Sequence, residues 1–296
     1  MKVSDTTVLI PNYNHARYLP ESLGAIFSQS AIPKEVIVID DASTDDSVSV
    51  IEKYQKCNPQ LKLIKNEINQ GPVKALNLGL KVATGKYLAF CSADDQVLPG
   101  FFEVGSECLD RFPEAGICSS DPSFFRGLKY TIFSISSYKT PTRIEVDAME
   151  KLFLNTRFWI PSHASLFRKD FVIECGGFEE TLHHLADWYL NIKIALRHGV
   201  VYAPTSFGAF RLSDQSYGAI WNRSYRKKIA IYSRLTALLS DESEEFRRRF
   251  RKSGVLGQIS SDFLLYLLFH FSLWKFLPYA FFRKTCNFFR KIKRTN

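Results

Sequence analysis

The segment VIVIDDAS (residues 36–43) decides the fold of this chain. Val36 to Ile39 form an uninterrupted apolar run rich in β-branched residues, and this pattern predicts a strand covered on both faces of a sheet. A second segment, YLAFCSADD (residues 87–95), has the same pattern, because the apolar run Tyr87 to Phe90 also leads to an acidic pair. We therefore expect two parallel strands that each end in carboxylates.

Carboxylates at the carboxyl ends of parallel strands lie where open α/β sheets bind their ligands. Two like charges about 4 Å apart repel by about 4 kcal/mol at an effective dielectric constant near 20. The acidic pairs at 40–41 and 94–95 therefore need a cation, hydrogen-bond donors or wide spacing. A divalent metal that holds a phosphorylated ligand is the most economical explanation.

Strand and helix patterns alternate around these two segments. Their β-α-β-α-β-α-β order predicts a doubly wound sheet with right-handed crossovers. The start of the second helix, Ser43 to Asp46, resembles a capping box with Asp in place of Glu. The expected strands cover residues 7–10, 36–39, 61–65 and 87–90, and the expected helices cover residues 19–29, 45–55 and 73–82.

The middle of the chain has weaker patterns. Residues 130–137 fit either a strand or a loop. Helices are expected at residues 101–111, 169–174 and 187–198, and strands at residues 117–119, 164–167 and 207–210.

Composition bounds the class of protein. A chain of 296 residues with 46% hydrophobic and 14% aromatic residues is long and apolar enough for one large α/β domain with an appendage, or for two domains. The six cysteines show no CxxC pair and no metal-ligand spacing, and no signal peptide precedes the first strand. A reducing cytoplasm is therefore the expected location.

The net charge of +9 belongs to one end of the chain. Residues 222–296 contain 17 Lys and Arg against 5 Asp and Glu, a net of +12, whereas the rest of the chain is net −3. This asymmetry indicates that the tail meets an anionic surface, either a membrane or a nucleic acid. We place the boundary between a catalytic domain (residues 1–221) and a basic, aromatic-rich helical tail (residues 222–296) at this change in composition.

The tail contains a long apolar stretch from Phe263 to Phe282. Its uninterrupted first part, residues 263–273, would make about 16 Å of helix against a hydrocarbon core of about 30 Å. The full stretch includes His270, Lys275 and Pro278, and a central Lys costs about 2.5 to 3.5 kcal/mol in a bilayer. An in-plane or re-entrant membrane anchor is favoured over a span. The alternative is that the segment packs on its own domain or in a dimer interface.

Several motifs in order resemble the motif series of a family-2 glycosyltransferase with the GT-A fold. The resemblance covers roughly residues 7–213 and implies a Rossmann-like doubly wound mixed sheet; the C-terminal helical extension, expected from its composition to associate with a membrane, lies beyond it. The matching motifs are VLIPNYN (8–14), IDDAS (39–43), NQG (69–71) with the later Asn77, SADD (92–95), GGFE (176–179) and ADW (186–188).

The resemblance implies a binding site for a nucleotide diphosphate sugar. It assigns Tyr13 to stacking on the base, Pro11 to shaping the adjoining turn, and Asp41 to accepting a hydrogen bond from the base. Asn77 and Arg211 are assigned to the same donor site. For Tyr13 the alternative is a residue that merely covers the sheet edge, and for Asp41 it is a helix cap, a position that Ser43 suits better.

The resemblance assigns the acidic pair of the SADD motif to ribose and metal. Asp94 and Asp95 share these roles, with Asp95 favoured as the ligand of Mn²⁺ or Mg²⁺, since hard oxygen ligands suit both ions. The common form of the motif is Asp-x-Asp-Asp, and here Ser92 takes the first position. Relatives also carry a histidine two residues after the Arg211 position, and that position is Ser213 here.

The resemblance makes Asp187 the catalytic base of a single displacement that inverts the anomeric centre. Ala186 replaces an often acidic neighbour, so Asp187 has no second carboxylate beside it. Its alternative role is to complement a helix N-terminus. His163 fits either the acceptor cleft or a hydrogen-bonded core position.

The leading hypothesis is a metal-dependent inverting glycosyltransferase that moves a sugar, expected to be UDP-linked, to a lipid-linked or glycan acceptor in surface polysaccharide synthesis. It would work on the inner face of the cell membrane, attached through the tail, without nucleic acid as a partner, and a homo-oligomer stays open. Two alternatives are a nucleotide-sugar-binding relative that has lost catalysis, suggested by positions 92, 186 and 213, and a nucleic-acid-binding protein that uses the basic tail.

Overall fold

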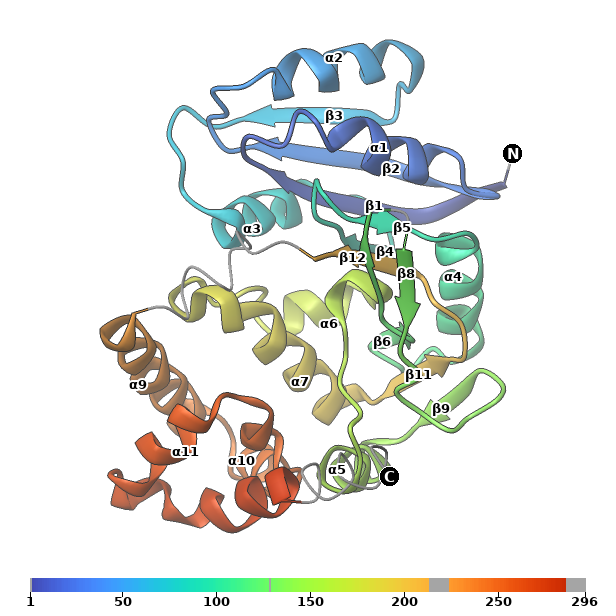
Figure 1. Ribbon diagram of the computed structural model, residues 1–296. Helices are drawn as coiled ribbons and strands as arrows, with labels where there is room; N and C mark the ends of the chain where they lie inside the picture. The colour runs from blue at the N-terminus through green and yellow to red at the C-terminus, as the bar shows by residue number, and fades with distance from the viewer. Residues whose placement is uncertain (1, 128, 213–223, 286–296) are drawn as a thin grey trace.

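An eight-stranded mixed sheet forms the centre of the chain, in the order β3-β2-β1-β4-β10-β6-β11-β9. The computed structural model describes residues 2–127, 129–212 and 224–285 (Figure 1). The larger sheet contains β1 (Lys2–Asn12), β2 (Ala31–Asp40), β3 (Leu61–Lys65), β4 (Tyr87–Phe90), β6 (Ile117–Ser120), β9 (Thr142–Ile144), β10 (Ser165–Arg168) and β11 (Val200–Ala203). The expected doubly wound mixed sheet is confirmed.

A smaller sheet and the helices complete the described structure. The smaller sheet has the order β5-β12-β7-β8, with β5 (Gln96–Val97), β7 (Ser123–Arg126), β8 (Lys129–Ile132) and β12 (Gly208–Arg211). The α-helices are α1 (Leu19–Phe27), α2 (Ser47–Cys57), α3 (Pro72–Val82), α4 (Phe101–Arg111), α5 (Val146–Asn155), α6 (Lys169–Glu174), α7 (Ala186–His198), α9 (Tyr225–Asp241), α10 (Glu244–Lys252) and α11 (Ser261–Leu268). The 3-10 helices are η1 (Ser162–Ala164), η2 (Glu180–Leu185), η3 (Val255–Gln258) and η4 (Phe271–Phe276).

The apolar strands are buried because helices cover both faces of the sheet. In β2, Val36 and Val38 face one core together with α1 and α4, whereas Ile37 and Ile39 face the other core together with α3 and α7. All four side chains are fully buried. Alternate residues of one strand therefore serve two cores, which explains why the sequence shows no polar alternation.

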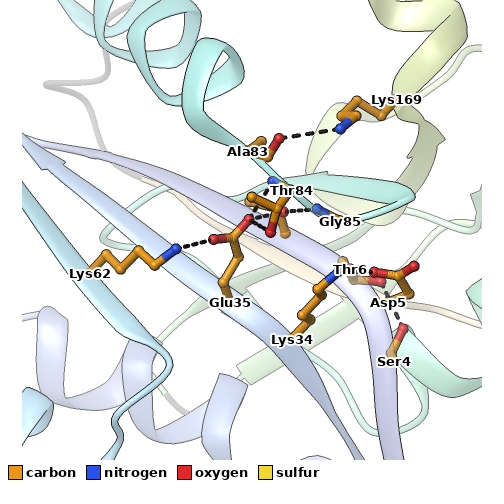
Figure 2. Close-up of polar contacts among 11 residues, drawn as sticks. Ser4, Asp5, Thr6, Lys34, Glu35, Lys62, Ala83, Thr84, Gly85 and Lys169 are labelled. Atoms are coloured by element: carbon orange, nitrogen blue, oxygen red, sulfur yellow. Dashed lines mark hydrogen bonds and ion pairs between the residues drawn. The ribbon is translucent and has the colours of Figure 1, made fainter.

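Glu35 ties the first four strands together from inside β2. Its Oε1 accepts hydrogen bonds from Thr7 Oγ1 at 2.6 Å and from Thr84 N at 2.6 Å, and its Oε2 accepts one from Lys62 Nζ at 2.6 Å (Figure 2). These donors come from β1, from the turn before β4, and from β3. The same turn lies so close to β1 that a Cβ on Gly85 would be 2.6 Å from Thr7 N, so only glycine fits there.

The tail helices pack on the rest of the chain through α7. Phe246, Phe250 and Phe263 are buried in the same core as Tyr189 and Leu190 of α7. Figure 1 shows α9, α10 and α11 at the end of the molecule opposite α2. Within the described residues, no helix combines the length and the apolar character that crossing a bilayer requires.

Some local expectations from the sequence were wrong. The helix expected from residue 45 begins at Ser47, and Ser43 does not cap it: its hydroxyl donates to Asp40 Oδ1 at 2.6 Å and accepts from Asn14 N at 2.9 Å. The apolar stretch 263–282 is not one helix. It is divided into α11, η4 and a helix over residues 277–285, with a break at Phe269 and His270.

We predict that Glu35→Gln lowers stability at neutral pH and removes a pH dependence. Burial alone raises the pKa of Glu35, but the hydrogen bonds from Lys62, Thr7 and Thr84 outweigh it and lower the pKa to about 2. The ionised carboxylate therefore stabilises the fold above the unfolded-state pKa of about 4.5, and this stabilisation is lost as the pH falls from there towards 2. We expect a loss of about 2 to 3 kcal/mol at pH 7, measured by urea denaturation between pH 7 and pH 3.

Glu52→Gln is the matched control. Glu52 also pairs with a lysine, Lys65, but both side chains are about half exposed, so a change below about 0.5 kcal/mol is expected. Equal losses for the two variants would contradict the role given to Glu35.

Candidate active site

The turn after β1 presents Tyr13 to solvent. Pro11 is the penultimate residue of β1 and pairs with Ile39 of β2, and Asn12 is buried with its amide donating to Asp40 Oδ1 at 2.7 Å. Asn14 has a positive φ of 56° and accepts from Thr44 N at 2.7 Å. The two turns after β1 and β2 are thus fixed to each other, and they leave the Tyr13 ring 43% exposed at the edge of the sheet.

Asp41 is held by the loop that follows β3. Its Oδ1 accepts from Asn66 Nδ2 at 2.8 Å, and its Oδ2 accepts from Gly71 N at 2.6 Å; Gln70 N lies 3.0 Å from both oxygens. The side chain is only 2% exposed. Asp41 therefore organises the 66–71 loop at this edge, and the hydrogen bond to a nucleotide base remains a prediction.

Asp95 is the most unusual carboxylate of this edge. It is 5% exposed, its Oδ1 accepts from Arg211 N at 2.8 Å, and its Oδ2 is buried without a hydrogen-bond partner in the described structure. Burial, and then the negative charge of Asp94, raise the pKa of Asp95 to about 7. A buried oxygen of this kind needs either a proton or a cation.

Arg211 holds the Asp94–Asp95 turn in place. Its Nε donates to Asp94 O at 2.8 Å, and its guanidinium forms an ion pair with Glu21 of α1. The guanidinium carbon lies 4.6 Å from the ring centroid of Tyr18 and 4.3 Å from that of Phe125. The predicted donor-site arginine is therefore engaged within the chain and fixes the acidic turn. Ser213, the position at which relatives carry a histidine, lies outside the described residues.

Asp187 lies in the first turn of α7, as the sequence predicts, and strand pairing brings it to the same edge. Its Oδ2 accepts from Ser162 Oγ at 3.0 Å, and Ser162 lies in η1 directly before β10. Strand β10 runs antiparallel to β4, so its start lies beside the end of β4. The residue is solvent-exposed, yet the protein around its carboxyl raises the pKa above the usual range.

A hollow of about 270 Å³ opens beside the Asp41 loop. Asn77 lines it and joins α3 to the GGFE segment, because its Nδ2 donates to Phe178 O at 2.8 Å and its Oδ1 accepts from Phe178 N at 3.1 Å. The full lining is Asn66, Gln70, Lys74, Asn77, Leu78, Lys81 and Glu180. The sequence analysis missed Lys74 and Lys81, although their spacing of seven residues puts two cations on one face of α3.

His163 lies next to Asp95 but is closed off. Both line a small cleft with no room for a water molecule. Burial lowers the pKa of His163 to about 4, and its Nε2 has no hydrogen-bond partner among the described residues. A Cβ on Gly208 of β12 would lie 2.0 Å from His163 O, so β12 can cross η1 only with glycine at this position. The Nε2 atom of His163 is therefore enclosed, while the residue as a whole is partly exposed, and its place in an acceptor cleft stays a prediction.

The residues present fit a hard divalent cation, although the described part of the chain does not by itself complete a ligand set. Asp94 and Asp95 offer neighbouring carboxylates, and Asp95 Oδ2 is an orphaned buried oxygen. Among residues 2–127, 129–212 and 224–285, no three His, Cys, Asp or Glu side chains are grouped to hold a metal. Further ligands would have to come from outside these residues, for example from the bound molecule or from water.

Comparison with known proteins bears on this geometry. The family model described as "Glycosyl transferase family 2" matches residues 7–175, which is more than half of the chain. Among curated relatives, an uncharacterized protein of Mycobacterium bovis is 28% identical over 84% of this chain and 71% of its own length. An uncharacterized glycosyltransferase of Escherichia coli, YibD, is 38% identical over 40% of this chain. That match spans only 34% of the relative's length, and a match to a Haemophilus influenzae glycosyltransferase spans 30%.

Solved structures share the fold over nearly the whole chain. S. aureus TarS 1–349 in complex with UDP-GlcNAc has a TM-score of 0.61 at 19% identity, covering 98% of this chain and 92% of TarS 1–349. A mannosyltransferase from Pyrobaculum calidifontis in complex with GDP-Man and Mn²⁺ has a TM-score of 0.57 at 17% identity, covering 97% of this chain and 85% of that structure. These likenesses establish the GT-A architecture. The match of the family model over more than half of the chain shows that it belongs to glycosyl transferase family 2.

Proposed function

We propose that this protein transfers a sugar from a nucleotide diphosphate sugar, UDP-linked, to a glycan or lipid-linked acceptor in surface polysaccharide synthesis. The observation that carries the proposal is the meeting of Asp41, Asp95 and Asp187 at one edge of the sheet, from β2, β4 and α7, in a member of a glycosyltransferase family. The parallel strand ends supply the donor side, and α7 supplies the acceptor side.

Donor binding is assigned to the loops after β1, β2 and β3. Tyr13 presents an exposed ring for stacking on a base, Asp41 fixes the loop beside the hollow, and Lys74 and Lys81 supply positive charge for a diphosphate. TarS has been solved with UDP-GlcNAc and UDP, which supports a UDP-linked donor as the first to test.

Asp94 and Asp95 would hold Mn²⁺ or Mg²⁺. When bound, such an ion stabilises the negative charge that grows on the departing diphosphate. The chain's own part is to orient the two carboxylates, since Arg211 fixes their turn through Asp94 O and Asp95 Oδ1. The Mn²⁺ complex of the Pyrobaculum mannosyltransferase supports this assignment.

Asp187 would act as the base that takes the proton from the acceptor hydroxyl. It is exposed to an incoming acceptor, and its raised pKa makes it a better proton acceptor than an ordinary aspartate. One displacement by the deprotonated hydroxyl at the anomeric carbon inverts its configuration.

The tail would hold the enzyme at an anionic membrane. Leu265 and Leu268 lie three residues apart on α11, Phe269 directly follows that helix, and the three are 49 to 80% exposed. Trp274, itself 49% exposed, donates its indole N–H to Leu268 O at 3.0 Å, so exposed apolar side chains lie on both sides of the break after α11. The net charge of +12 in residues 222–296 complements an anionic leaflet, with each nearby Lys or Arg worth about 1 kcal/mol.

We predict that Asp95→Asn weakens Mn²⁺ binding by about 10- to 100-fold and abolishes most transfer activity, because an amide oxygen is a weaker ligand than a carboxylate. Isothermal titration with Mn²⁺ and UDP, and transfer assays with a panel of UDP-sugars, would measure both effects. Asp110→Asn, an exposed aspartate paired with Lys86, is the control and should match the wild type. Activity that survives both EDTA and Asp95→Ala would refute the metal role.

We predict that Asp187→Asn lowers kcat by about 10²- to 10⁴-fold with little change in the KM for the donor, since it removes a base and leaves the donor site intact. The matched control is Asp170→Asn, because Asp170 also lies in the first turn of a helix, α6, but at the opposite edge of the sheet. A wild-type kcat for Asp187→Asn would exclude Asp187 as the base, and donor binding without any turnover by the wild type would favour the alternative of a non-catalytic relative.

We predict that the double variant Phe269→Ser/Trp274→Ser reduces binding to vesicles of anionic phospholipid at least tenfold in a flotation assay, because apolar area at the interface supplies affinity. Ile173→Ser is the control, since Ile173 is 54% exposed but lies on α6. Unchanged flotation would contradict the membrane surface. Tight, salt-sensitive binding to single-stranded nucleic acid in place of vesicles would favour the nucleic-acid alternative.

A further inference from the structure

The Asp187 carboxylate is held by two donors from its own chain. Ser162 Oγ donates to Oδ2 at 3.0 Å, and the amide of Trp188 donates to Oδ1 at 2.8 Å. The first bond joins two separate elements, η1 and α7. Together the bonds restrict rotation of the carboxylate, and each oxygen keeps a lone pair for an incoming hydroxyl.

A buried amide in turn orients Ser162. Asn191 Nδ2 donates to Ser162 Oγ at 2.9 Å and to Ile160 O at 3.1 Å, and the side chain is only 3% exposed. Asn191 follows Asp187 by four residues on α7, so the two side chains lie on the same face of the helix. A serine hydroxyl has one hydrogen. Because Asn191 fills an acceptor position of that hydroxyl, the hydrogen is directed to Asp187.

We propose that Ser162 and Asn191 are positioning residues that keep Asp187 ionised and aimed at the acceptor hydroxyl. This inference rests on the proposed role of Asp187 as the base. The chain Asn191 to Ser162 to Asp187 has a fixed direction of donation, which favours the charged form of the carboxylate over the protonated form.

Among the described residues, hydrogen bonds rather than an ion pair favour the charged form of Asp187. In the described part of the chain, no Lys or Arg forms an ion pair with Asp187. Of the titratable groups in the adjacent 3-10 helices, His163 of η1 and His183 and His184 of η2 have a pKa that burial lowers, and Glu180 of η2 accepts a hydrogen bond from Asn77 Nδ2 at 3.2 Å. Although the residue is exposed, the protein packed around its carboxyl raises the pKa of Asp187 by desolvation, and the bonds from Ser162 and Trp188 oppose that rise.

The test is the pH profile of kcat/KM for Ser162→Ala at saturating Mn²⁺. Without the hydroxyl, burial acts with less opposition, so the acidic limb should move to higher pH by about 0.5 to 1 unit, and kcat should fall about tenfold at neutral pH with an unchanged KM for the donor. Ser162→Thr, which keeps a hydroxyl, should restore the wild-type limb. Asn191→Leu should move the limb in the same direction by a smaller amount, and it provides a second route if Ser162→Ala does not fold.

Ser123→Ala is the matched control. Ser123 is a fully buried serine in β7, whereas Ser162 is partly buried, and the Ser123 hydroxyl has no hydrogen-bond partner in the described structure, so the profile of Ser123→Ala should match the wild type. A wild-type acidic limb in both Ser162→Ala and Asn191→Leu would overturn the inference. If Asp187→Asn is inactive while these variants keep the wild-type limb, only the positioning role fails. If Asp187→Asn is fully active, the proposed base itself fails.

Discussion

The register of the first four strands depends on one buried carboxylate. Glu35 accepts hydrogen bonds from β1, from β3 and from the turn that begins β4, so a shift of any of these strands by one residue would break a charge-assisted bond in the interior. That register also sets where each strand ends. Asn12 pairs with Asp40, and Cys91 N donates to Leu9 O, so the turns that carry the acidic residues leave the sheet at one level.

Arg211 connects this half of the sheet to the smaller sheet. The residue lies 116 positions after Asp95 and still donates its amide to that carboxylate, while its guanidinium reaches Glu21 of α1. The aromatic rings of Tyr18 and Phe125 cover the guanidinium. A residue that is distant in sequence therefore supports the acidic turn, and its amide gives the Asp95 carboxylate a defined direction before any ligand binds.

The N-terminal half could be predicted from the sequence because its signals are local. Apolar runs such as Val36 to Ile39 lie between helical patterns, and β3, β4 and α4 have the bounds that the sequence indicates. The strands β9 and β11 and helix α5 were not foreseen, since β9 has only three residues and β11, with four, directly follows α7. The sequence of residues 130–137 fits either a strand or a loop. Pairing with β7 makes Tyr130 part of the short edge strand β8.

The site was predictable in its residue types but not in its connections. A family resemblance identifies Asp41, Asp95 and Asp187, and it assigns them roles towards the nucleotide base, the metal ion and the acceptor hydroxyl. The structure adds what these carboxylates do within the chain: Asp41 holds the 66–71 loop, and Asp187 is held by Ser162. Such contacts join residues about 25 to 30 positions apart, and no periodicity in a single sequence encodes them. Their roles with ligands remain predictions.

The attachment of α7 to the tail makes the C-terminal region more than an appendage. The Glu242 carboxylate forms ion pairs with Lys193 and Arg197, each at 2.7 Å, and accepts a hydrogen bond from the Tyr189 hydroxyl at 3.2 Å. The Trp188 indole donates to Gln258 Oε1 at 2.8 Å. Four side chains along one flank of the helix that bears Asp187 thus depend on residues beyond 240. A chain shortened to its N-terminal portion would leave these groups without their partners and would expose that flank of α7 to solvent. The two portions therefore have to be expressed and engineered as one unit.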